Sequence, residues 1–301
     1  MQNVFNTKIV EMNYTPLFED YQLLDSGNGE KLERFGRFIL RRPEPQAVWH
    51  KSLPQKEWLS ADASFLKEDR SEERGEWKMR PGMPDRWNVQ YKYGTMSLKF
   101  RLALTSFKHV GLFPEQAANW NFIYDLCSRM SSPKVLNLFA YTGGASLAAA
   151  SAGAQVTHVD SVKQVLSWSS DNASLSGIDG IRWIHDDALK FAHREQRRGN
   201  RYRGVILDPP AYGRGANGEK WVLEQNIAEL MECLSSLLEE ENSFLVLNLY
   251  SMGLSSTIAR TLVHQFFSKI DREEFGELYF DDLSQKSLPL GTFYRMLTCV
   301  R

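Results

Sequence analysis

Two stretches decide the fold: VLNLFAYTGG (residues 135–144) and VILDPPAYG (residues 205–213). Each is a short apolar run that ends in a polar or glycine turn. Between them lies a third such run, QVTHVD (residues 155–160), which ends at Asp160. Apolar runs of four to six residues bounded by turn formers are typical of buried strands. The sequence therefore predicts three buried strands, each followed by a turn that contains glycine or polar residues.

Working outward, strands and helices alternate from about residue 111 to the end. Regular alternation of this kind predicts a parallel, doubly wound Rossmann-like α/β sheet with right-handed crossovers. Ligands of such sheets bind at the carboxyl ends of the strands, where all the turns quoted above fall. The pattern predicts strands over 135–139, 155–159, 181–184, 204–207, 244–249, 276–280 and 292–300, and helices over 117–130, 145–152, 162–175, 188–197, 219–240 and 256–269.

The first 110 residues follow a different pattern. Turn formers such as Gly27-Asn28-Gly29 separate short apolar stretches over 17–60, and residues 87–104 partly alternate apolar with polar. The charge-rich stretch 62–76 is typical of a solvated loop or helix face. We therefore expect a small β-rich accessory domain over 1–110 and an α/β domain over 111–301.

Composition excludes several classes of protein. Of the 301 residues, 43% are hydrophobic, and the formal net charge is −1. This overall charge gives no sign of affinity for nucleic acid or membranes. The cysteines, Cys127, Cys233 and Cys299, form neither a metal pattern nor a disulfide framework. No secretory signal and no apolar run of about 18 residues is visible. We expect a cytoplasmic protein with no metal and no membrane partner.

The turn after the first strand suggests a cofactor. S-adenosylmethionine needs close backbone approach for its methionine part, an acceptor for its ribose hydroxyls and a contact for adenine. The glycines of the turn 140–144 allow the approach. Asp160 follows at a spacing that suits the ribose hydroxyls, and Asp186 or Asp187 could accept from the adenine amino group. Alternatively, the glycines could form a purely structural turn, and a single Asp at a strand end could cap the following helix. An NAD site competes, but its full G-x-G-x-x-G fingerprint is absent.

The turn after the fourth strand suggests the reacting site. Asp208, Pro209 and Pro210 form a rigid turn whose side chain and carbonyl could accept from a planar amino group, and Tyr212 could stack on its ring. Methyl transfer is an in-line displacement that needs alignment more than acid–base power. The prolines could instead merely stop the strand. The continuation GRGANGEKW (213–221) is typical of an active-site lid.

Further motifs complete a family pattern: HVGLFPEQ (109–116), THVDSV (157–162), DDALKF (186–191) and GTFYRML (291–297). Over residues 98–301 the chain resembles the class I methyltransferases of the bacterial large-subunit ribosomal RNA methyltransferase I and K type. The resemblance implies a sheet with an inserted antiparallel last strand, S-adenosylmethionine as cofactor, and a base of ribosomal RNA as substrate. The full set of expected cofactor residues is Gln116, Asn137, Phe139, Ala140, Tyr141, Thr142, Gly143, Asp160, Ser161, Asn172, Asp186, Asp187 and Asp208.

The sequence departs from this family pattern at the reacting site. Members that methylate cytosine C5 carry Ser-Cys-Ser after the fifth strand, where this chain has Tyr250-Ser251-Met252, so Ser251 takes the nucleophile position. The family often has Lys-Phe after Asp-Pro-Pro, where this chain has Ala211-Tyr212. Without a cysteine at either strand end, we expect methylation of a base nitrogen, with Asp208, Pro209, Pro210 and Tyr212 as the catalytic set.

The substrate evidence is a pair of basic clusters that interleave with aromatic residues. Cations neutralise phosphates and aromatic rings stack on unpaired bases, whereas paired surface charges are the alternative reading. Three other functions remain as alternatives: a methyltransferase that acts on a protein or small molecule, a noncatalytic RNA-binding or assembly factor that retains the pocket, and an NAD-linked oxidoreductase. A homo-oligomer is compatible with all of them. The clusters are Arg80, Arg86, Trp87, Tyr91, Lys92, Tyr93, Lys99 and Arg101, and Arg194, Arg197, Arg198, Arg201, Tyr202 and Arg203.

Overall fold

The computed structural model describes residues 12–14, 17–68, 73–250 and 254–299. Its centre is an eight-stranded sheet in the order β1-β16-β17-β15-β12-β9-β10-β11. All neighbouring strands are parallel except that β17 runs antiparallel to both β15 and β16. The strands are β1 (Met12–Tyr14), β9 (Lys134–Leu138), β10 (Gln155–Asp160), β11 (Arg182–His185), β12 (Gly204–Leu207), β15 (Ser243–Leu249), β16 (Arg272–Asp281) and β17 (Ser287–Thr298).

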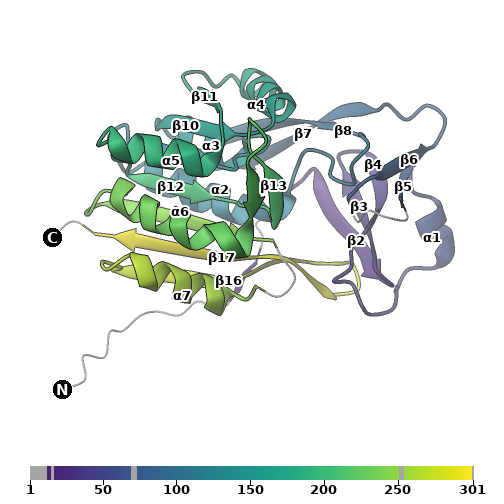
Figure 1. Ribbon diagram of the computed structural model, residues 1–301. Helices are drawn as coiled ribbons and strands as arrows, with labels where there is room; N and C mark the ends of the chain where they lie inside the picture. The colour runs from purple at the N-terminus through teal and green to yellow at the C-terminus, as the bar shows by residue number, and fades with distance from the viewer. Residues whose placement is uncertain (1–11, 15–16, 69–72, 251–253, 300–301) are drawn as a thin grey trace.

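Helices cover both faces of this sheet (Figure 1). Side chains of β9, β12 and β15 alternate between two apolar clusters: Leu136, Val205 and Leu245 pack on one face, whereas Val135, Ile206 and Phe244 pack on the other. Burial on both faces explains why these strands read as continuous apolar runs. One face carries η1 (Pro114–Gln116), α2 (Ala117–Cys127), α3 (Gly144–Ser151) and α4 (Lys163–Ser176), and the other carries α5 (Ala188–Arg197), α6 (Leu223–Leu237) and α7 (Ser256–Phe266).

The Rossmann-like fold with its inserted antiparallel last strand is therefore confirmed. One predicted helix is partly wrong. Residues 220–222, expected inside a helix over 219–240, form strand β14 (Lys220–Val222), which pairs with β13 (Tyr212–Arg214). The bulky apolar pair Trp221 and Val222 suits a strand, and the backbone N–H of Val222 donates to the Asn226 side chain where α6 begins. The charge-rich stretch 62–76 contains strand residues rather than a helix face.

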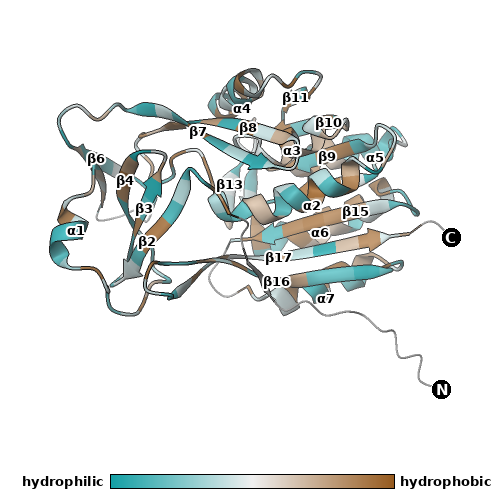
Figure 2. Ribbon diagram, turned by 180° about the vertical axis from the view of Figure 1, so that it is seen from behind, coloured by the Kyte–Doolittle hydropathy of each residue, from teal (hydrophilic) through white to brown (hydrophobic). Residues whose placement is uncertain are grey.

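The first 110 residues contribute to three places. A five-stranded sheet contains β2 (Tyr21–Gly27), β3 (Glu30–Phe35), β4 (Phe38–Pro43), β5 (Ala63–Lys67) and β6 (Gly75–Met79), with α1 (Gln55–Leu59) between β4 and β5. Figure 2 shows it beside the helix-covered sheet. The hairpin of β7 (Arg86–Tyr93) and β8 (Met96–Ala103) instead lies against α2 and α4, and β1 pairs with β16.

The hairpin is tied to the helices by named contacts. The Tyr91 and Phe100 rings lie 5.5 and 5.2 Å from the Trp120 ring of α2. The backbone N–H of Arg101 donates to the Asn172 side chain of α4 at 2.9 Å. The hairpin is thus packed as part of the catalytic core, and the boundary at residue 110 stays a prediction. Within the described part of the chain, no helix has the length and apolarity needed to cross a membrane.

A buried ion pair docks the five-stranded sheet on the catalytic core. The Lys286 ammonium, just before β17, lies 2.8 Å from a carboxylate oxygen of Asp25 in β2. Asp25 is fully buried and also accepts from the backbone N–H of Leu53 and the indole N–H of Trp58. Burial raises the pKa of Asp25, but the hydrogen bonds from Lys286, Leu53 and Trp58 outweigh it, so the net shift is downward.

We expect Lys286→Ala to destabilise the protein by about 3 kcal/mol, because it leaves the buried Asp25 carboxylate without its counter-charge. Urea unfolding followed by tryptophan fluorescence measures the loss. Arg272→Ala, which removes an exposed ion pair with Glu274, should cost less than about 0.5 kcal/mol and serves as the control. Equal losses in the two variants would contradict the role given to Lys286.

Candidate functional site

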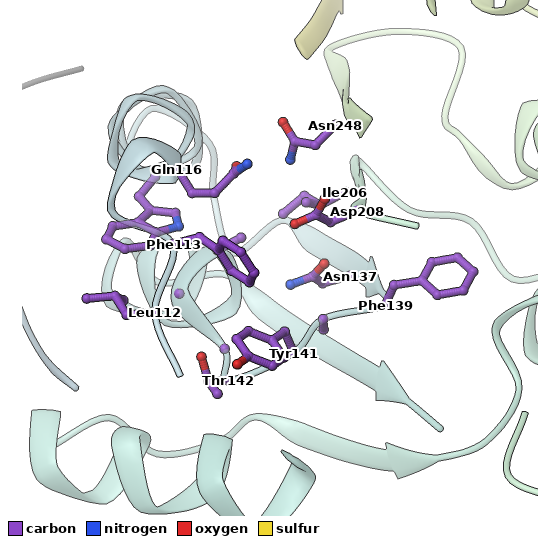
Figure 3. Close-up of a pocket in the computed structure, with 15 residues that line it drawn as sticks. Leu112, Phe113, Gln116, Asn137, Phe139, Tyr141, Thr142, Ile206, Asp208 and Asn248 are labelled. Carbon is purple, nitrogen blue, oxygen red and sulfur yellow. The ribbon is translucent and has the colours of Figure 1, made fainter. Parts of the chain in front are cut away.

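Two neighbouring cavities lie at the carboxyl ends of the parallel strands. The central cavity is drawn in Figure 3. The hairpin cavity is lined in part by the β13–β14 hairpin, and Phe139 lines both cavities. The central cavity is lined by Leu112, Phe113, Gln116, Trp120, Asn137, Phe139, Ala140, Tyr141, Thr142, Gly143, Gly144, Ala145, Ile206, Asp208 and Asn248. The hairpin cavity is lined by Phe139, Val159, Asp160, Ser161, Asp186, Asp187, Ala188, Pro210, Gly213, Arg214, Gly215 and Trp221.

The turn after β9 shapes the central cavity. Phe139, Tyr141 and Gly143 all have positive φ angles, of 54°, 48° and 96°. Positive φ is unfavourable for residues with a side chain, and such strain persists only where neighbours enforce it. The backbone N–H of Tyr141 donates to Asp160 at 3.0 Å, and the Thr142 hydroxyl donates to the Gly111 carbonyl at 2.7 Å. These two bonds hold the turn open toward the cavity.

The helix that follows this turn requires a glycine. A Cβ atom on Gly144 would lie 2.6 Å from the Trp120 ring, closer than any real contact. Trp120 therefore reaches the cavity wall only because residue 144 has no side chain. Next to it, the side chain of Asn137 in β9 is held by a hydrogen bond of 2.9 Å to the Ser146 hydroxyl. The cradle that the sequence predicts at 140–144 is present in the structure.

Asp160 connects the two cavities. Its Oδ2 accepts from the Tyr141 backbone N–H, and its Oδ1 accepts from the Val162 backbone N–H at 2.9 Å. Burial raises the pKa of Asp160, and these amides oppose the shift. Each carboxylate oxygen can accept more than one bond, so Asp160 keeps capacity for a ligand in the hairpin cavity. The adjacent Ser161 hydroxyl donates to the Arg214 carbonyl at 2.8 Å and ties the hairpin down.

The two carboxylates after β11 have different tasks. Asp186 forms an ion pair with Arg194 and accepts from the Asp187 backbone N–H at 2.9 Å. Asp187 caps α5 through Oδ1, which accepts from the Lys190 backbone N–H at 3.0 Å. Asp187 Oδ2 faces Gly215, where an added Cβ would lie 2.7 Å from it. Asp187 is therefore both a helix cap and a cavity wall, and Asp186 is neutralised by a cation.

Asp208 ends β12 and lines the central cavity opposite the turn. Burial raises the pKa of its carboxyl to about 7. Asn248 of β15 lies beside it on the same wall (Figure 3), and its Oδ1 accepts from Asn119 at 2.7 Å. Asn119 in turn donates to Gln116 at 2.9 Å and accepts from Arg295 at 2.7 Å. Our sequence analysis left out Asn119, Asn248, Trp120 and Phe113; only Asn248 carried a usable signal, since it ends a strand like Asp208.

The expected lid is a short hairpin over the hairpin cavity. Trp221 of β14 lies 4.7 Å from the Phe139 ring, and its indole N–H donates to the Pro210 carbonyl at 2.7 Å. Glu219 forms an ion pair with Lys190 of α5. Tyr212, at the start of the hairpin, is 73% exposed and lines neither cavity. The proline pair thus supports the hairpin as well as ending the strand.

Two of the expected site residues line neither cavity, and a third position lies outside the described residues. Asn172 is fully buried and lines neither cavity, because its amide bonds to the backbones of Arg101 and Thr142. Pro209 is also buried and lines neither cavity. Ser251, at the expected nucleophile position, lies outside the described residues. Within those residues no group of His, Cys, Asp and Glu could hold a metal ion.

The two basic clusters differ in how many of their cations form ion pairs. In the second cluster Arg194, Arg198 and Arg203 pair with Asp186, Glu195 and Glu239. Most of it lies at the end of α5 and the start of β12, the edge of the sheet away from the cavities. In the first cluster, Arg86, Lys92 and Lys99 occupy exposed positions of the β7–β8 hairpin. These three cations form no ion pair among the described residues, although the bond from Tyr93 to Asp125 and that from Lys99 to Ser176 place Lys92 and Lys99 near the carboxyl ends of α2 and α4.

We expect Asp208→Asn to stabilise the unliganded protein in a pH-dependent way. The Asp208 carboxyl titrates near 7 when folded and near 3.8 when unfolded, so the folded state binds the proton more tightly. Its contribution to stability is complete below pH 4 and is lost as the pH rises through 7. The asparagine does not titrate, so the midpoint difference between variant and parent should grow from pH 4 to pH 8 in thermal melts. A difference that stays constant with pH would refute the assignment.

Comparisons with known proteins identify the family to which this fold belongs. Residues 66–258 match the family model of S-adenosylmethionine-dependent methyltransferases. The crystal structure of a SAM-dependent methyltransferase from Agrobacterium tumefaciens superposes with a TM-score of 0.87, at 35% identity over 96% of this chain and 93% of that chain. SMU.776, crystallised with SAH, shares the fold with a TM-score of 0.70 at 18% identity, over 92% of this chain and 75% of that one.

Curated relatives include the ribosomal RNA large subunit methyltransferases K/L of Shewanella frigidimarina and Pseudoalteromonas atlantica. The first is 30% identical over 53% of this chain, and the second is 28% identical over 64% of it. The chain spans only about a quarter of the length of these relatives, 22% and 25%. On the family match and the Agrobacterium structure, the chain belongs to the S-adenosylmethionine-dependent methyltransferase family.

Proposed function

We propose that this chain methylates a base of RNA, at a nitrogen rather than a carbon, and that ribosomal RNA is its substrate. One observation carries the choice of atom: a half-buried carboxyl, Asp208, stands at the reacting end of the central cavity with an amide, Asn248, beside it. Asp208 accepts from a planar amino group, whereas Asn248, whose Oδ1 already accepts from Asn119, offers its NH2 group as a donor to the same ring. We further propose that the reaction takes place in the cytoplasm, where the substrate is.

The cysteines support a nitrogen target. Cys127 and Cys233 are buried within α2 and α6, and burial raises their pKa values to about 12 and about 11. Cys299 follows β17. None of the three lines either cavity, and a thiol with a raised pKa is a poor nucleophile. Attack by a cysteine on a ring carbon is therefore disfavoured.

The residues fit the cofactor in two parts. The glycine turn and Asn137 of the central cavity suit the methionine part, and Asp160 and Asp187 of the hairpin cavity suit the ribose and adenine. S-adenosylmethionine supplies an activated methyl group on a positively charged sulfur. A nearby positive charge lowers the pKa of a buried carboxyl, which favours the ionised form of Asp208. Ionised Asp208 accepts a hydrogen bond from the acceptor amino group, fixes its orientation and can take its proton.

RNA contact is assigned to two surfaces. The exposed side chains of Arg86, Lys92 and Lys99 on the β7–β8 hairpin suit phosphate groups. The exposed ring of Tyr212 suits stacking on an unpaired base. The curated relatives are named as ribosomal RNA methyltransferases, which favours the same class of substrate. The N-terminal domain over 1–110 is proposed to help hold the substrate, and self-association is compatible with the fold.

We expect Asp160→Ala to weaken cofactor binding at least tenfold, about 1.4 kcal/mol, because it removes both a wall of the hairpin cavity and the bond to Tyr141. Isothermal titration with S-adenosylhomocysteine measures the dissociation constant. The exposed Asp179, in the loop before β11, provides the control Asp179→Ala, which should match the parent. Affinity within twofold of the parent would rule out the proposed role of Asp160.

The central experiment transfers labelled methyl from S-adenosylmethionine into RNA and protein from cells that lack this chain. We expect label that RNase releases and protease does not, with a methylated nitrogen found by nucleoside analysis. Asp208→Ala should reduce the rate at least about 100-fold, some 2.7 kcal/mol, while S-adenosylhomocysteine affinity stays within threefold. Label released only by protease would move the substrate to protein, and unchanged turnover of the variant would remove Asp208 from the mechanism.

A further inference from the structure

A buried arginine stands behind the wall of the central cavity. Arg295, from the motif GTFYRML (291–297) in β17, is 5% exposed and lines neither cavity. Its guanidinium carbon lies 4.8 Å from the centre of the Phe122 ring and 4.7 Å from that of the Phe293 ring. Glu274 approaches its Nη1 only to 3.5 Å, and Nη2 has no hydrogen-bond partner among the described residues. The charge is therefore buried against aromatic rings with weak compensation.

Such a charge needs a reason beyond packing. An apolar side chain of similar volume is often as stable as a buried ion pair, or more stable. Burial lowers the pKa of Arg295 to about 10, so the guanidinium still carries its proton at neutral pH. Arginine can only donate hydrogen bonds. Its short bond, of 2.7 Å, runs from Nε to Oδ1 of Asn119 in α2, so the direct effect of Arg295 falls on that amide.

The bond from Arg295 fixes which way round the Asn119 amide lies. If the amide turned over, its NH2 group would meet Nε, donor against donor. Nδ2 of Asn119 therefore faces away from the guanidinium, and it donates to Gln116 Oε1 at 2.9 Å and to Asn248 Oδ1 at 2.7 Å. With those two oxygens engaged, the NH2 groups of Gln116 and Asn248 are left for the central cavity, which both residues line. One cation thus sets the direction of three amides.

The Asn248 amide stands next to the reacting carboxyl. Leu207 of β12 pairs with Leu247 of β15, so Asp208 and Asn248 follow a registered pair of neighbouring strands. Such strands lie about 4.8 Å apart. Figure 3 shows the nitrogen of Asn248 on the side of Asp208. An ionised carboxylate only accepts and an NH2 group only donates. The wall of the central cavity therefore offers one acceptor and one donor side by side.

Resting on the function proposed above, we propose that Arg295 is a positioning residue for the acceptor base. Through Asn119 it holds the NH2 group of Asn248 in the donor direction beside Asp208. The chemical edge that matches this wall is an exocyclic amino group next to an unprotonated ring nitrogen. The amino group donates to Asp208, and the ring nitrogen accepts from Asn248. Adenine, cytosine and guanine each carry such an edge, whereas uracil has no amino group. The methyl group is added to the exocyclic amino nitrogen.

The main test is Asn119→Asp, which keeps the shape of the side chain and its bond to Arg295 but removes the NH2 donor. A carboxylate at position 119 accepts from Gln116 and Asn248, so both amides turn over and direct their oxygens into the cavity. With RNA from cells that lack this chain, we expect kcat/KM to fall at least about thirtyfold, because one hydrogen bond is lost and the new oxygen repels the ring nitrogen. The melting temperature should not fall, since Arg295 gains a carboxylate partner.

Asn121→Asp on the same helix is the matched control. Asn121 is buried and lines neither cavity, and its Oδ1 accepts from the Tyr91 hydroxyl at 2.9 Å, as a carboxylate also can. This variant should match the parent in kcat/KM. Activity like that of the parent in Asn119→Asp, or an equal loss in Asn121→Asp, would overturn the inference.

A second pair of variants tests Arg295 itself. Arg295→Met is of similar length but has no donor, so Asn119 is free to turn, and kcat/KM should fall at least about tenfold without a loss of stability. Arg295→Lys keeps a donor toward Asn119 and should recover to within about threefold of the parent. A loss of activity that only follows the melting temperature across these variants would contradict a positioning role.

Two further measurements separate this inference from its neighbours. The dissociation constant of S-adenosylhomocysteine should stay within about twofold of the parent in every variant. A loss of about tenfold would overturn the inference, since the amides would then hold the cofactor. Nucleoside analysis should find the methyl group on an exocyclic amino nitrogen. A methyl group on a ring nitrogen would refute the inference while leaving RNA methylation at nitrogen intact.

If the parent labels no RNA, the proposed function fails, and NMR of protein with isotope-labelled asparagine decides the amide direction separately. The side-chain NH2 signal of Asn248 is assigned by its loss in Asn248→Asp. In the parent this group faces the cavity, whereas in Asn119→Asp it is bonded to a buried carboxylate. Its exchange with water should therefore be at least about tenfold faster in the parent. Equal exchange rates would show that Arg295 does not set the direction of the amide.

Discussion

The hydrogen bond from the Tyr141 backbone N–H to the Asp160 carboxylate holds the site together. It joins the turn after β9 to the end of β10 and keeps Tyr141 in a left-handed conformation that its side chain disfavours. Without this bond the turn would relax, and the shared wall at Phe139 would move with it. The central and hairpin cavities would then lose their common boundary. Asp160, for which the sequence suggested ribose binding or a helix cap, is therefore also a structural tie of the site.

Much of this arrangement could be predicted from the sequence because both strand ends and turn residues leave local signals. Asp160, Asp187 and Asp208 each follow an apolar run, and all three line a cavity. The sequence did not predict features that depend on contacts with residues far away in the chain. Asn172 looks like a site residue, but its amide is satisfied by backbone groups more than 25 residues away. Strand β14 forms because β13 pairs with it, which a helical pattern over 219–240 does not disclose.

The N-terminal sheet shows a different limit of sequence reading. Its buried charges, such as Glu33 with Arg42, look like surface residues in the sequence because charged side chains are seldom fully buried. The structure pairs them at the boundary with the catalytic domain, where Arg42 also donates to the Lys108 carbonyl at 3.2 Å. Paired buried charges fix orientation more than they add stability. These paired charges help to fix the orientation of the N-terminal sheet relative to the loop before α2.

The position of β17 has a consequence for synthesis of the chain. It lies between β15 and β16 in the sheet, yet it leaves the ribosome after both of them. Until residues 287–298 emerge, β15 has an unpaired edge, and β1 and β16 cannot join the rest of the sheet. Exposed strand edges invite pairing with other chains. The nascent chain therefore passes through a stage with two incomplete sheet fragments, and insertion of β17 joins them.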